Sequence, residues 1–86
     1  MSEPRLIVEV LSESTEAYDR GDKFEQYRRF PSLEEYALIS PVKLKTEIFR
    51  RDTSGHWVLY EFGSEEQVHF ASIDLTLEPS SLFENL

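Results

Sequence analysis

Glu9 and Lys23 are the side chains whose types and spacing could do chemistry together. Glu9 stands late in a short apolar segment, and Lys23 lies in a later segment with helical character. A carboxylate near the C-terminal end of a strand can hold a divalent cation, and a lysine on the following helix can reach the same crevice, where α/β folds usually bind ligands. A cation would polarise a scissile phosphate, and an ammonium would orient the nucleophile and offset developing negative charge. The pair therefore indicates phosphodiester cleavage.

Each of these residues also has a purely structural interpretation. Glu9 could be a paired acid at a strand edge, and Lys23 could be a solvated helix residue or an i,i+4 partner of Asp19. Tyr27 could pack in the core with its hydroxyl at the surface instead of contacting phosphate. The adjacent Arg28 and Arg29 could complement a helix C-terminus. The functional interpretation requires these side chains to converge in space.

Glu9 and Lys23 need a strand and a helix to position them. Residues 5–11 (RLIVEVL) form an apolar run interrupted only by Glu9, which predicts a buried strand, and residues 12–18 form a polar connection. Asp19 is expected to cap a helix that begins near Arg20 and ends near Arg29, before Pro31. Residues 32–35 are expected to form one further helical turn.

The remaining chain is rich in short β-prone runs. Residues 36–40 predict a strand that completes a right-handed parallel strand-helix-strand crossover. Residues 45–51 and 57–62 flank a turn at residues 52–55 and predict an antiparallel hairpin. A short strand at residues 67–70 and a helical turn at residues 80–85 should follow. The fold class is therefore α/β, more narrowly an α+β arrangement with a mixed sheet.

Length and charge bound the function. The 86 residues suffice for one small domain, and a net charge of -8 opposes a general phosphate-binding surface, although a carboxylate-rich metal site is acidic by nature. No apolar run approaches a membrane span and no signal peptide is recognisable, so a cytoplasmic protein without membrane contact is expected. The absence of cysteine excludes disulfides and thiolate metal sites.

Other constellations are unsupported. His56 and His69 lack a neighbouring acid at ligand spacing, which argues against zinc. Ser12 and Ser14 have no nearby histidine base or nucleophile-elbow glycines. Only three glycines are present, and they form no phosphate-binding loop.

The segment VEVLSESTEAYDRGDKFEQYRRFPSLEEYALIS resembles the Uma2 family of restriction-endonuclease-type domains, and the resemblance continues through EIFRR, the Gly55-His56-Trp57 turn and IDLTL. It implies a PD-(D/E)XK fold acting on DNA with Mg²⁺ or Mn²⁺. Glu9 and the backbone carbonyl of Val10 would then be metal ligands, Glu9 and Lys23 would be catalytic, and Tyr27 and Asp19 would support them.

The resemblance implies the C-terminal half of such a domain, so that residues 1–86 would form a single truncated unit. Arg5 stands where the family commonly has an aspartate after proline, and the preceding strand with its metal-binding aspartate is not in the sequence. Two hypotheses follow: a magnesium-dependent endonuclease that is incomplete or inactive alone, or a non-catalytic remnant that acts as an interaction module. An open sheet edge would favour a homo-oligomer or pairing with a complementary fragment.

Overall fold

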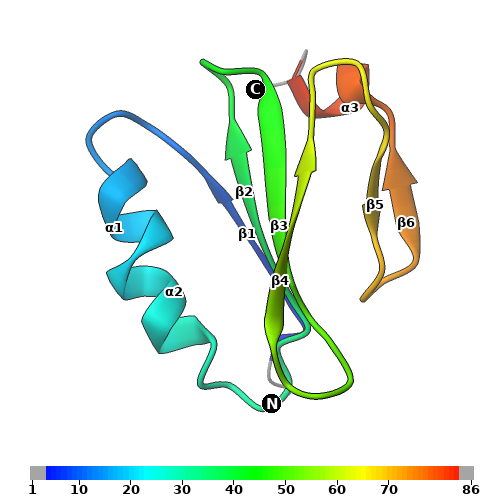
Figure 1. Ribbon diagram of the computed structural model, residues 1–86. Helices are drawn as coiled ribbons and strands as arrows, with labels where there is room; N and C mark the ends of the chain where they lie inside the picture. The colour runs from blue at the N-terminus through cyan, green and yellow to red at the C-terminus, as the bar shows by residue number, and fades with distance from the viewer. Residues whose placement is uncertain (1–3, 84–86) are drawn as a thin grey trace.

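The computed structural model describes residues 4–83 and has an α+β architecture with a mixed sheet at its centre (Figure 1). Its elements, in chain order, are β1 (Leu6–Val10), α1 (Glu16–Arg20), α2 (Asp22–Tyr27), β2 (Glu35–Ser40), β3 (Lys45–Arg51), β4 (Trp57–Phe62), β5 (Val68–Phe70), β6 (Leu75–Leu77) and α3 (Pro79–Phe83). The short helices α1 and α2 lie on one side of the sheet, and the β5–β6 hairpin lies on the other (Figure 1).

The main sheet has the strand order β1-β2-β3-β4. β1 and β2 are parallel and are joined through α1 and α2, whereas β2, β3 and β4 are antiparallel. The expected parallel crossover and the expected hairpin are thus both confirmed, and the hairpin strands have the predicted bounds. The register aligns Glu9, Leu38 and Glu47 in one row across β1, β2 and β3.

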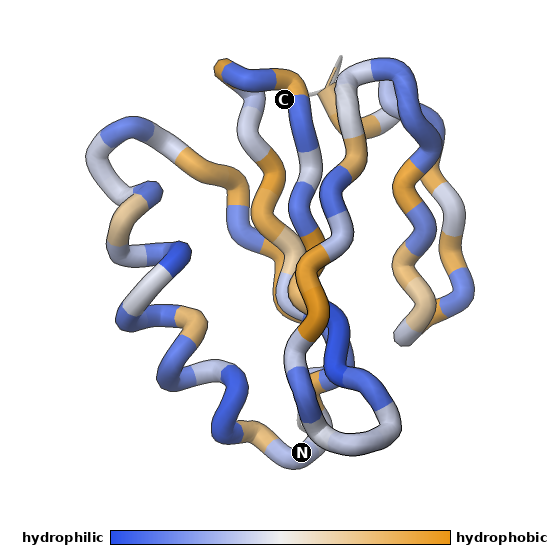
Figure 2. Tube along the Cα trace, viewed as in Figure 1, coloured by the Kyte–Doolittle hydropathy of each residue, from blue (hydrophilic) through white to orange (hydrophobic). Residues whose placement is uncertain are grey.

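β2 is the centre of the fold because all six of its residues are buried. Successive side chains of a strand point to opposite faces. Tyr36 and Leu38 therefore join the helix-side cluster, which also contains Leu11 and Phe24. The hairpin-side cluster lies on the other face and contains Ala37, Ile39, Ile48, Val68, Phe70 and Leu82. Figure 2 shows the apolar residues concentrated in the strands, whereas α1 and α2 are mostly polar.

The helical segment differs from the prediction. Helical structure begins at Glu16 and ends at Tyr27, and Asp19 lies inside α1 instead of capping it. The N-cap residue is Thr15, and the first turn closes earlier because the backbone N–H of Glu16 donates to the carbonyl of Ser12. Gly21 separates α1 from α2. No helix within residues 4–83 has the length and apolar content that crossing a membrane would require.

One further prediction is wrong, and one strand was not predicted. Residues 32–35 form no helical turn, and Glu35 is already the first residue of β2, because its pairing with Arg50 extends the sheet. β6 was not expected, and it pairs with β5 through the register Val68↔Leu77. The predicted C-terminal turn is present as α3, and residues 84 and 85 of that prediction lie outside the described chain.

Candidate active site

Glu9, Lys23 and Asp19 meet at the contact between β1 and the helical crossover. The Lys23 Nζ lies 2.9 Å from the Glu9 Oε1 and 3.4 Å from the Asp19 Oδ1. The Asp19 side chain is only 4% exposed, whereas Glu9 and Lys23 remain partly accessible. The structure thus brings together two carboxylates and one ammonium from three different elements.

Local structure explains this convergence. Glu9 is the fourth residue of β1 and points to the helix side, like Ile7, which packs against the helix-side cluster. Lys23 lies in the first turn of α2, directly before Phe24. Phe24 is buried against Tyr36, Phe49 and Trp57, so the aromatic packing fixes the helix that carries Lys23.

The carboxylates set the electrostatics of this group. The hydrogen bond from Lys23 to Glu9, reinforced by the charges of Glu9 and Asp19, raises the pKa of Lys23 above its ordinary value of 10.5. The ammonium therefore stays charged at neutral pH. Burial raises the pKa of the nearby Tyr36 hydroxyl, and the charges of Glu9 and Asp19 raise it further, so this hydroxyl remains a hydrogen-bond donor.

Glu9 and Asp19 supply the carboxylate oxygens that a divalent cation could use at this centre. Within residues 4–83, no three Asp, Glu or His side chains gather at metal-ligand distance. Mg²⁺, however, is usually held by one or two carboxylates together with water and substrate phosphate. Glu9 and Asp19 already converge on a positive charge, the Lys23 ammonium. Their hard oxygen donors, together with the partial access of Glu9 to solvent, fit such a cation.

The other expected site residues lie around this centre. Val10 ends β1 and follows Glu9, so its carbonyl lies at the same end of the strand. Tyr27 ends α2 and packs against the helix-side cluster, with its ring centroid 5.8 Å from that of Tyr36. Arg5 is paired with Glu34 at an exposed position and supplies no ligand.

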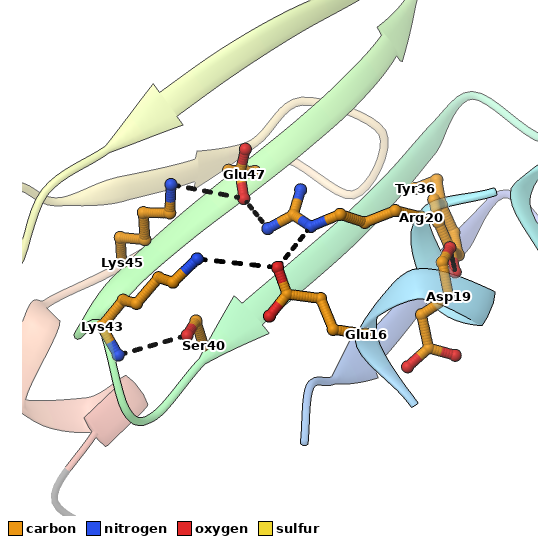
Figure 3. Close-up of polar contacts among 8 residues, drawn as sticks. All are labelled: Glu16, Asp19, Arg20, Tyr36, Ser40, Lys43, Lys45 and Glu47. Atoms are coloured by element: carbon orange, nitrogen blue, oxygen red, sulfur yellow. Dashed lines mark hydrogen bonds and ion pairs between the residues drawn. The ribbon is translucent and has the colours of Figure 1, made fainter. Parts of the chain in front are cut away.

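A second charged cluster links α1 to β3, which neighbours β2 on the side away from β1 (Figure 3). The sequence did not predict this cluster. Arg20 Nε donates to the Glu16 Oε2 at 2.7 Å, and its Nη2 donates to the Glu47 carboxylate on β3. The Lys45 Nζ lies 3.8 Å from the Glu47 Oε1, and the Lys43 Nζ lies 3.7 Å from the Glu16 Oε2. The hydrogen bond to Glu47 raises the pKa of Arg20 further above its ordinary value.

The cluster carries a weak sequence signal. Arg20 precedes Lys23 by three residues, and residues at this spacing lie on the same helix face. Glu47 and Phe49 are two residues apart on β3, so their side chains point to the same face of the sheet. Phe49 packs on the helix side, and the Glu47 carboxylate therefore faces the helices as well. Lys23 pairs with Glu9, and Arg20 pairs with Glu47. Glu9 and Glu47 lie on either side of Leu38 in one row of the sheet, so the two ion pairs connect the helices to this row.

Comparisons with known proteins agree with this fold. The sequence profile of the Uma2 family, described as putative restriction endonuclease, matches residues 1–81, and the chain belongs to this family. Two proteins of Synechocystis sp., both described as uncharacterized, are 35% identical to it over 83 and 72 residues. These matches cover 96% and 83% of this chain but only 44% and 41% of the relatives, so the chain spans less than half their length.

A solved structure shows the same architecture. The crystal structure of a putative nuclease belonging to DUF820, from Anabaena variabilis, matches with a TM-score of 0.74 at 17% sequence identity. The match covers 98% of this chain and 46% of that one. The expected nuclease-like α+β fold with a mixed sheet is therefore confirmed.

Proposed function

We propose that this chain carries the cation-binding and lysine-bearing part of a DNA endonuclease site that hydrolyses phosphodiester bonds. The observation that supports the proposal is the convergence of Glu9 and Asp19 on the Lys23 ammonium. Membership of the Uma2 family, described as putative restriction endonuclease, supports DNA as the substrate class, and the geometry supports the choice of residues. We place this activity in the cytoplasm.

Glu9 and the carbonyl of Val10 would hold Mg²⁺ or Mn²⁺, and Asp19 would add a second carboxylate from α1. Such a cation supplies positive charge that stabilises the charge developing on the phosphate oxygens. Asp19 is suited to this task because its carboxylate is nearly buried and fixed in α1. A buried carboxylate keeps its geometry, which favours a defined ligand position.

Lys23 would donate hydrogen bonds to the scissile phosphate and orient the attacking water. Its ammonium is partly accessible and is held by Glu9 at 2.9 Å, so its position is defined before substrate arrives. Such preorganised charge is a large contributor to catalysis. Tyr27 would support the site by anchoring the end of α2 in the helix-side cluster.

The net charge of -8 requires a local source of phosphate contacts. Arg20, Lys43 and Lys45 gather beside the candidate site on the same face, and Lys43 is the most exposed of them. The length of the relatives beyond the matched region offers a further source.

Cleavage of supercoiled plasmid with Mg²⁺ or Mn²⁺ tests the proposal. Glu9→Gln removes the ligand charge at constant size, and Lys23→Met removes the ammonium but keeps the aliphatic chain. Each should lower the rate by about 10²-fold, in line with losses of preorganised charge in other enzymes.

Arg29→Met is the control for loss of one positive charge, because the Arg29 side chain is 75% exposed and its Nη2 lies 3.6 Å from the Glu25 Oε1, away from Glu9 and Lys23. It should keep the same order of activity as the unmodified chain. Equal cleavage by Glu9→Gln, Lys23→Met and the unmodified chain would contradict the proposal.

A second candidate function is a non-catalytic interaction module that forms a homo-oligomer or pairs with a complementary fragment. The observation that favours it is the open edge of β1, which has β2 on one side only within the described residues. Val8 and Val10 are 43% and 49% exposed on the face away from the helices. An unmodified chain that cleaves no DNA with either cation would favour this candidate.

A further inference from the structure

Tyr36 contacts both α1 and α2, the two short helices that connect β1 to β2. It lies on β2, is fully buried, and is not among the residues assigned to the proposed site. Its hydroxyl donates a hydrogen bond of 2.8 Å to the backbone carbonyl of Asp19, in the last turn of α1. Carbonyls in the last turn of a helix need such external donors.

The ring of the same residue contacts the other helix. It stacks on Phe24 of α2, with centroids 5.1 Å apart and an interplanar angle of 2°. Gly21 lies between these two contacts, where α1 ends and α2 begins. One side chain therefore contacts both short helices, on either side of the point where α1 ends and α2 begins.

These contacts of Tyr36 lie next to the group formed by Glu9, Asp19 and Lys23. Asp19, whose carbonyl accepts the hydroxyl, also places its carboxylate 3.4 Å from the Lys23 Nζ. Phe24, on which the ring stacks, directly follows Lys23. We propose that Tyr36 is a positioning residue that holds α1 and α2 in register, so that the Lys23 ammonium stays between Glu9 and Asp19.

This inference rests on the proposed role of Lys23, but it can be tested without DNA or metal. The chain has three lysines, so the ¹⁵Nζ signals of Lys23, Lys43 and Lys45 can be resolved and assigned by NMR. In Tyr36→Phe, which removes only the hydroxyl, the Lys23 ammonium protons should exchange with water several-fold faster, and their contacts with the Glu9 side chain should weaken. The signals of Lys43 and Lys45 should not change.

Tyr60→Phe is the matched control, because it removes a hydroxyl on β4 while its ring still lies under Arg50. It should leave the Lys23 exchange rate unaltered. A folded Tyr36→Phe chain with the original Lys23 exchange rate would overturn the inference. So would an equal acceleration at all three lysines, which would indicate general loosening.

If Tyr36→Phe does not fold, the unmodified chain provides the test. The Tyr36 hydroxyl proton should exchange slowly and show contacts with the end of α1. A rapidly exchanging hydroxyl without such contacts would overturn the inference. Because these readouts need no cleavage, the positioning role stays measurable in a chain that cleaves no DNA.

Discussion

Lys23 satisfies two sequence-based interpretations at once. The i,i+4 contact with Asp19 forms, and Lys23 also contacts Glu9, as the catalytic interpretation requires. The sequence could indicate both, because one is local and the other follows from a strand-helix unit. It could not indicate Tyr36, whose contacts with Asp19 and Phe24 depend on where β2 lies beneath the crossover.

Glu35 is a second residue whose role emerges only from tertiary structure. It is fully buried on the hairpin side, where its Oε2 accepts from Arg50 Nε at 2.8 Å and its Oε1 accepts from the Ser72 backbone N–H at 2.7 Å. Burial alone would raise the pKa of Glu35. The hydrogen bonds from Ser72 and Arg50 outweigh burial, and the pKa lies below its ordinary value of 4.5.

This carboxylate should make stability dependent on pH. A lowered folded-state pKa contributes stability above the unfolded value of 4.5, and that contribution is lost as pH falls through the folded-state pKa. At pH 7, Glu35→Gln should lower the free energy of unfolding by about 1–3 kcal/mol, because it removes a buried charge that accepts two hydrogen bonds.

Urea denaturation from pH 7 to pH 3 measures this effect. The difference between the unmodified chain and Glu35→Gln should shrink as pH falls below 4.5. A difference that is constant across this range would show that the Glu35 charge does not carry the stabilisation.

At the scale of elements, local patterns predicted the strands well and the helices less well. Residues 45–51 and 57–62 are β-prone runs that flank a turn. In this turn the Asp52 Oδ1 accepts hydrogen bonds from the backbone N–H groups of Ser54 and His56, so the hairpin is encoded locally. α1 starts earlier than predicted, because Glu16 and Ala17 lie in a stretch whose composition is typical of a polar loop. β6 is only three residues long and is stabilised by pairing with β5, which its own sequence does not reveal.

The open edge of β1 leads to a prediction about assembly. If β1 pairs with another copy, the chain should sediment as a dimer or larger species at micromolar concentration. Val8→Lys should weaken this association by about tenfold or more, because a charged side chain on an edge strand opposes pairing.

Val42→Lys is the control for surface charge, since Val42 is 78% exposed in the turn between β2 and β3. It should leave the sedimentation unchanged. A monomer at all concentrations for the unmodified chain would contradict pairing through β1.

At the scale of the whole molecule, seventeen acidic residues against nine basic ones produce the net charge of -8. Composition alone argued against nucleic-acid binding, whereas the fold shows where charges of both signs are concentrated. Four of the nine basic residues, Arg20, Lys23, Lys43 and Lys45, are engaged with acids between the crossover and the sheet. This arrangement could not be deduced from composition, because it depends on the register between β1, β2 and β3.

The central claim is that Glu9 and Asp19 form one cation site beside Lys23, distinct from the generally acidic surface. Paramagnetic Mn²⁺ titrated into the ¹⁵N-labelled chain tests this directly, because it broadens amide signals near the bound ion. At substoichiometric Mn²⁺, the signals of residues 8–11 and 19–23 should broaden first, and Glu9→Gln should abolish this selectivity. Uniform broadening over the acidic surface, or the same selective pattern in Glu9→Gln, would contradict the account.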